Sequence, residues 1–100
     1  MRSNTGGMAS HRIKSEPVGG HDHLVSVTGG EADVEFTVRA MPSSLEALGF
    51  EAAREHDVVA ATVDFLIRRQ GAEDLPGFVD LDDACAAYED LPVELARQLR

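Results

Sequence analysis

Two short runs in which apolar and polar residues alternate constrain the fold of this chain most strongly. Their apolar members recur at every second position: Val25, Val27, Val34, Phe36 and Val38. A period of two places these side chains on one face of a strand. Gly29 and Gly30 lie between the runs, where a tight turn requires positive φ. The runs therefore predict a β-hairpin, whose apolar face must be covered by helices or by a second subunit because an isolated hairpin is marginal in water.

Helical patterns follow the hairpin. Ser43 and Ser44 offer N-cap hydroxyls to a short helix over residues 45–48. Residues 51–70 form the strongest helical pattern, because their apolar side chains recur at steps of three and four. Gly71 follows as a C-cap, which predicts that this helix ends there.

The last part of the chain predicts a turn and two further helices. The turn covers residues 74–77, Asp80 is the expected N-cap of the next helix, and Pro92 suits the first turn of the last one. The predicted fold class is α+β, with an N-terminal β-hairpin packed against three to four helices and preceded by a disordered tail.

The tail is assigned to residues 1–20, which contain two Gly-Gly pairs and show no apolar periodicity. Residues 21–100 are expected to form a single small α+β domain. A chain of 100 residues with 43% hydrophobic residues suits one globular domain. Its core is modest at this size, so forming a homodimer is one way to bury more apolar surface.

Cysteine content and the length of apolar runs bear on the compartment. The single cysteine, Cys85, can form neither an internal disulfide nor a cysteine-based zinc site, which agrees with a reducing compartment. The longest apolar runs are far below the roughly 18 to 20 residues that a bilayer span needs. We therefore expect a soluble, cytoplasmic protein that does not bind membranes.

The formal charge of −9 is concentrated near the C-terminal end. From residue 73 to residue 90 the chain carries no base and seven acids: Glu73, Asp74, Asp80, Asp82, Asp83, Glu89 and Asp90. Such a surface repels a phosphate backbone, so nucleic acid is not expected as a partner. The acids form either a solvated surface or a docking face for an unidentified, basic protein partner.

The candidate metal ligands are His11, His21 and His23. An extended strand would place His21 and His23 on one side, and imidazole suits zinc, copper or nickel. If translation began at Met8 and that residue were removed, the new N-terminus would present an amine, two amides and the His11 imidazole to Cu(II) or Ni(II). The alternative is a solvated segment that binds no metal, and no cofactor is predicted.

No catalytic residues are predicted. Residues 78–82 match the apolar-Asp-x-Asp pattern of phosphotransfer enzymes, but those enzymes need a larger parallel sheet, and a helix start explains the aspartates here. No serine or cysteine can be placed beside His56 from the sequence, and acidic neighbours disfavour the thiolate of Cys85. We therefore expect a protein that is not an enzyme, most simply a protein interaction or regulatory module.

The order of elements in the middle of the chain resembles the ribbon-helix-helix family. The resemblance covers a strand over residues 34–40, a Pro-Ser-Ser turn and helices over residues 45–56 and 57–69. In that family two strands pair across a dimer and their outward residues read the major groove. The resemblance implies a DNA-binding regulator or antitoxin as the second expectation, and a weak metal-binding protein is the third.

Overall fold

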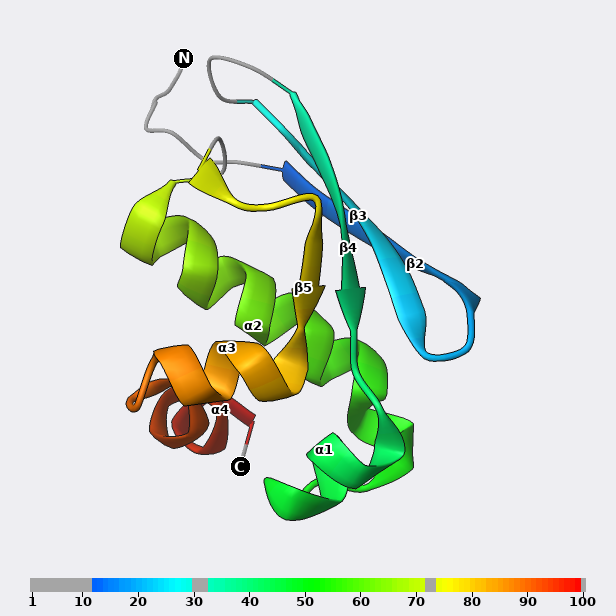
Figure 1. Ribbon diagram of the computed structural model, residues 1–100, viewed down its shortest axis with the longest axis vertical. Helices are drawn as coiled ribbons and strands as arrows, with labels where there is room; N and C mark the ends of the chain where they lie inside the picture. Colours follow the sequence, from blue (N-terminus) through cyan, green and yellow to red (C-terminus); the bar gives the residue numbers. More distant parts are fainter. Residues whose placement is uncertain (1–11, 30–32, 72–73, 100) are drawn as a thin grey trace, which may run out of the picture.

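The computed structural model describes residues 12–29, 33–71 and 74–99. Its strands form one sheet in the order β2-β3-β4-β5. They are β2 (Arg12–Gly19), β3 (Asp22–Thr28), β4 (Val34–Arg39) and β5 (Phe78–Asp80). β3 lies antiparallel to both β2 and β4, and β5 lies parallel to β4. Figure 1 shows the helices gathered on one side of this sheet, which confirms the α+β class.

The predicted hairpin is confirmed as β3 and β4. Val25 lies opposite Phe36 and Val27 lies opposite Val34. Along β3 the side chains alternate between buried and half-buried, because only one face of the sheet packs against helices. The alternation that predicted the hairpin is therefore the same alternation that fills the core.

Residues 12–19 are a strand, so the assignment of residues 1–20 to a flexible tail is wrong over this stretch. β2 pairs along its length with β3, and Lys14 lies opposite Ser26. Gly19 and Gly20 make the turn between the two strands with φ of 114° and 59°. Most side chains of β2 are exposed, so this strand is held mainly by backbone hydrogen bonds to β3. Backbone hydrogen bonds leave no apolar periodicity in the sequence. Residues 1–11 lie outside the described residues.

β5 is the second strand that the sequence patterns do not predict. It is three residues long and follows the predicted turn directly. The Thr37 N–H of β4 donates a hydrogen bond to the Gly77 carbonyl at 2.9 Å. The strand that pairs with β5 is about forty residues earlier in the chain. The three residues of β5 are also too few to show a period of two, so the sequence does not reveal this strand.

The helices lie close to their predicted places, except at the start of the first one. They are α1 (Pro42–Ala47), the 3-10 turn η1 (Ala52–Arg54), α2 (Glu55–Gln70), α3 (Leu81–Ala87) and α4 (Leu91–Leu99). The predicted helix over residues 51–70 thus begins with one 3-10 turn. α1 begins at Pro42, three residues before the predicted start, and Met41 rather than Ser43 or Ser44 is its N-cap. The Asp82 N–H donates to Asp80 Oδ1 at 2.9 Å, which confirms Asp80 as the N-cap of α3.

The core lies between the sheet and α2. The fully enclosed side chains include Val25 and Val38 from the sheet, Val58 and Val63 from α2, and Leu95 from α4. α4 packs against α2, so the C-terminal helix closes the core on the side away from the sheet. Within the described ranges, no helix has the length and apolarity needed to cross a membrane.

Candidate functional site

A groove of about 250 Å³ lies where α2, β5 and α3 meet. Its apolar lining comes from these elements and from the loop before β5: Leu66, Leu75, Pro76, Phe78, Val79 and Ala84. Its polar lining is Gln70, Asp80, Asp83 and Tyr88. We call this site the acidic groove, because both of its charged lining residues are aspartates.

The groove exists because β5 passes into α3 without a loop. Asp80 is the last residue of β5 and the N-cap of α3. At this corner Phe78 is 46% exposed and lines the groove. The Arg39 guanidinium lies 5.1 Å from the centre of the Phe78 ring and covers part of it.

Tyr88 lies at one side of the groove and is fixed there by three contacts. Its hydroxyl donates to Gln70 Oε1 at 2.8 Å, and its ring meets Phe65 edge-on, with 5.6 Å between the centroids. The Arg69 guanidinium lies over the rings of Phe65 and Tyr88 and forms an ion pair with Asp90. These contacts therefore fix the position of this side of the groove.

The two aspartates of the groove differ in their surroundings, because Asp80 caps α3 and interacts electrostatically with Arg39. No ion pair of the described residues includes Asp83. Arg39, whose guanidinium contacts Phe78, is bound by both carboxylate oxygens of Asp22, at 2.8 and 3.3 Å. This bond holds the pKa of Asp22 below its usual value. Arg39 thus forms its ion pair with Asp22 outside the groove and also interacts electrostatically with Asp80 inside it.

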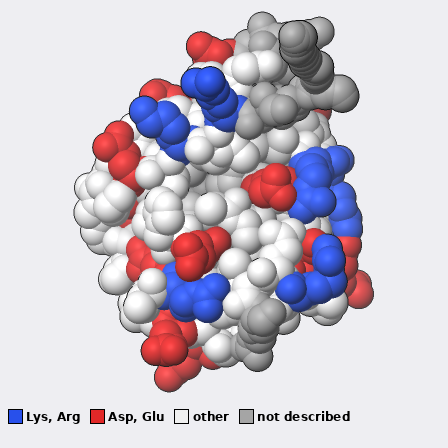
Figure 2. All heavy atoms as spheres, turned by 180° about the vertical axis from the view of Figure 1, so that it is seen from behind, with Lys and Arg blue, Asp and Glu red and all other residues white. Residues whose placement is uncertain are grey.

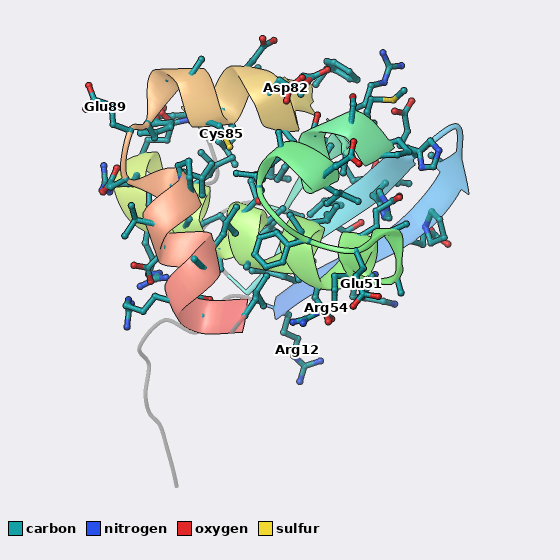
Figure 3. All side chains as sticks on the ribbon, turned by 90° about the horizontal axis from the view of Figure 1, so that it is seen from below. Arg12, Glu51, Arg54, Asp82, Cys85 and Glu89 are labelled. Carbon is teal, nitrogen blue, oxygen red and sulfur yellow. The ribbon has the colours of Figure 1, made fainter. Side chains whose placement is uncertain are left out.

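The acids proposed as partner contacts do not form one uniform surface. Asp80 and Asp83 line the groove, while Asp90 is paired with Arg69. Figure 3 shows Asp82 and Glu89 at the two ends of α3, pointing away from the body of the molecule. Asp74 is exposed just before β5, and Glu73 lies outside the described residues.

His21 and His23 meet at one carboxylate. Glu55 at the start of α2 accepts hydrogen bonds from His21 Nδ1 at 2.9 Å and from His23 Nε2 at 2.5 Å. Burial opposes ionisation of Glu55, but the two histidine bonds outweigh it, and the pKa of Glu55 lies below its usual value. His23 is 3% exposed, and among the described residues its Nδ1 has no hydrogen-bond partner. The two histidines therefore tie the turn between β2 and β3 to α2.

Other candidate ligands and nucleophiles lie apart from one another. Within the described ranges, no three His, Cys, Asp or Glu side chains are arranged to hold a metal ion. His56 is exposed, with its ring 6.4 Å from that of His23, and His11 lies outside the described residues. Burial, with a smaller effect of Asp82, raises the pKa of the Cys85 thiol, so this thiol is protonated at neutral pH.

The arrangement differs from the ribbon of a ribbon-helix-helix dimer. β4 pairs with β3 on one side and with β5 on the other, so its edges are already occupied. The expected boundary between helices at residues 56 and 57 lies inside α2. Figure 2 shows one face of the molecule, on which Lys and Arg side chains lie interspersed with Asp and Glu side chains. The coloured atoms of that face form no extended basic area of the kind that attracts a phosphate backbone.

Sequence reasoning missed the apolar half of the acidic groove and the role of Glu55. Phe78 and Tyr88 come together only because β5 pairs with β4, a contact that no local pattern signals. The signal that was present is Phe78 itself, a large apolar residue beside aspartates and Gly77. No family model, no curated protein and no solved structure matches this chain.

Proposed function

We propose that this protein is a non-enzymatic interaction module that binds a basic segment of a partner protein in the acidic groove. The observation that carries the proposal is the combination of an apolar lining, with Phe78 46% exposed, and the carboxylate of Asp83, which forms no ion pair with any described residue. An exposed apolar surface with a polar rim is typical of binding sites. Charged groups at the rim select the partner by its opposite charge.

The chemistry of the groove defines the segment that suits it. An apolar side chain of the partner covers Phe78 and Val79, and Lys or Arg residues beside it face Asp80 and Asp83. Arg39 forms its ion pair with Asp22 and interacts with Asp80, whereas Asp83 has no ion pair among the described residues, so the partner supplies the charge that neutralises Asp83. We place this module in the cytoplasm, as a regulator or adaptor, because a single unpaired Cys85 suits a reducing compartment.

Affinity capture from a lysate of the source cells, followed by quantitative mass spectrometry, tests the proposal. The baits are the full chain, its Asp83→Lys variant and its Glu46→Lys variant. Glu46 is exposed on α1 and lies outside the groove, so the control makes the same change of charge elsewhere. Circular dichroism first checks that all three baits are folded.

We expect proteins with basic segments to be enriched by the wild-type chain and by Glu46→Lys, and to be lost with Asp83→Lys. Raising the salt concentration should weaken their capture, because the contacts at the rim are exposed to solvent. Equal recovery by all three baits, or no enrichment even at low salt, would contradict the proposal.

A further inference from the structure

Among the described strands, β2 forms a long edge of the sheet with no strand on its outer side. The strand order places β2 and β5 at the two edges of the described sheet. β5 has three residues, whereas β2 has eight and pairs with β3 on one side alone among the described strands. Such an edge presents unpaired N–H and C=O groups to any strand that can align with it.

The register of the sheet determines which backbone groups of β2 face outward. The Ala40 N–H donates to the His21 carbonyl at 3.0 Å, so the odd-numbered residues of β3 bond toward β4. The even-numbered residues of β3 then bond toward β2, where they lie opposite even-numbered residues. Backbone orientation alternates along a strand. Ile13, Ser15 and Pro17 therefore direct their backbone groups to the open edge, and Pro17 has no N–H to offer.

We propose that β2 pairs antiparallel with β2 of a second copy, so that two sheets join into one across a two-fold axis at Ser15. Backbone groups that face the edge must bond to backbone groups that face the edge in the second copy. With the axis at Ser15, Ser15 lies opposite Ser15 of the second copy, and Ile13 lies opposite Pro17 of the second copy. Four backbone hydrogen bonds form: two between the serines, and one from each Ile13 N–H to the opposite Pro17 carbonyl. This inference does not depend on the acidic groove.

Charge selects this register among its neighbours. With Ser15 on the axis, Lys14 lies opposite Glu16 of the second copy, and the pair occurs twice. Shifting the register one way puts Lys14 opposite Lys14 of the second copy, although it also puts Arg12 opposite Glu16, and shifting it the other way puts Glu16 opposite Glu16. Like charges directly opposite each other destabilise strand pairing, and opposite charges stabilise it. Of these three registers, only the one with its axis at Ser15 pairs opposite charges without placing like charges directly opposite each other.

Two further properties favour a second copy at this edge. In a chain of formal charge −9, β2 carries Arg12 and Lys14 against Glu16, so copies that meet here repel each other less than elsewhere. Figure 3 shows Arg12 extending away from the body of the molecule. Ile13, half-buried in the single chain, gains an apolar neighbour in Pro17 of the second copy.

Sedimentation equilibrium of the full chain over a wide concentration range tests this proposal through a charge swap. Lys14→Glu alone and Glu16→Lys alone replace two attractive pairs by two repulsive ones, and each should weaken the dimer about tenfold or more. The double variant restores opposite charges and should recover the wild-type dissociation constant. Glu35→Lys, an exposed change on β4, is the control and should leave dimerisation unchanged.

The decisive result is the recovery in the double variant, because neither general charge nor misfolding produces it. Ser15→Pro should abolish the dimer, since it removes the two central hydrogen bonds, while circular dichroism reports whether the monomer remains folded. A chain that stays monomeric up to millimolar concentration overturns the proposal, as does a dimer that is insensitive to the single charge reversals. Asp83→Lys should dimerise as the wild type does, which separates this result from the fate of the acidic groove.

Discussion

At the scale of single residues, Glu55 joins parts of the chain that are about thirty residues apart. Its two carboxylate oxygens each accept one histidine hydrogen bond from the end of the first hairpin. Because the carboxylate is largely shielded, these bonds contribute more to stability than exposed ion pairs do. A neutral side chain at this position leaves the buried His23 without its charged partner.

We therefore expect Glu55→Gln to lower the free energy of unfolding by about 1–3 kcal/mol near neutral pH. The pKa of Glu55 is lower in the fold than its usual value of 4.5, so this contribution is complete above that value. It is lost as the pH falls through the lowered pKa, and the difference between wild type and variant should shrink in acid. Urea unfolding measured across the acid range checks this.

Glu51→Gln is the matched control, because Glu51 is exposed and its side chain makes no capping hydrogen bond. It should change the free energy of unfolding by less than about 0.5 kcal/mol. A stability difference for Glu55→Gln that stays constant down to acid pH would contradict the role given to this carboxylate.

The Cys85 thiol provides a second prediction for a single residue. Burial raises its pKa, and the negative charge of Asp82 adds to this effect. We expect it to react several-fold more slowly with a disulfide reagent at neutral pH than the same chain unfolded in urea, because the thiolate is the reactive form. Asp82→Asn should increase the rate of the folded chain, and Glu89→Gln should not. Equal rates for folded and unfolded chains would show that the thiol is not shielded.

At the scale of elements, the corner between β5 and α3 depends on the Asp80 side chain. It satisfies the backbone N–H of Asp82 in the first turn of a helix of only seven residues. Asp80→Ala should therefore lower the free energy of unfolding by about 1 kcal/mol, the usual effect of losing an N-cap. Asp80→Asn retains an acceptor and should cost much less. Equal losses in the two variants, measured by urea unfolding, would mean that charge rather than capping matters here.

β2 shows how pairing can overrule local composition. Its sequence contains a proline and three charged residues, and its side chains lie mostly exposed. Those features resemble a solvated segment, yet β3 offers it a row of backbone groups at the correct spacing. Strand formation in this case is decided by the neighbouring strand, not by the apolar content of the segment itself.

At the scale of the whole molecule, the core closes only when α4 packs on α2. Leu91 and Leu95 of α4 are almost completely buried, whereas Val93 between them is 68% exposed. We expect Leu95→Ala to lower the free energy of unfolding by about 2–5 kcal/mol, a large share of the roughly 5–15 kcal/mol that stabilise a small domain. Val93→Ala should change it by less than about 0.5 kcal/mol. Similar unfolding midpoints for the two variants would contradict this packing.

Local patterns in the sequence determined most of the elements. The period of two in residues 25–38 produced the central hairpin, the steps of three and four produced α2, and Asp80 marked the start of α3. These features depend on neighbours a few residues away, so a single sequence reveals them. The same reasoning placed the acids of the C-terminal part but not which of them line a groove.

Only the tertiary structure decided the edges of the sheet and the acidic groove. β2 and β5 form because partner strands offer them hydrogen bonds. Glu55 binds His21 and His23 because the start of α2 lies beside the turn between β2 and β3. Each of these contacts joins segments whose local composition carries no sign of the other. The physical reason is that hydrogen bonding and burial depend on distance in space, whereas periodicity records only distance along the chain.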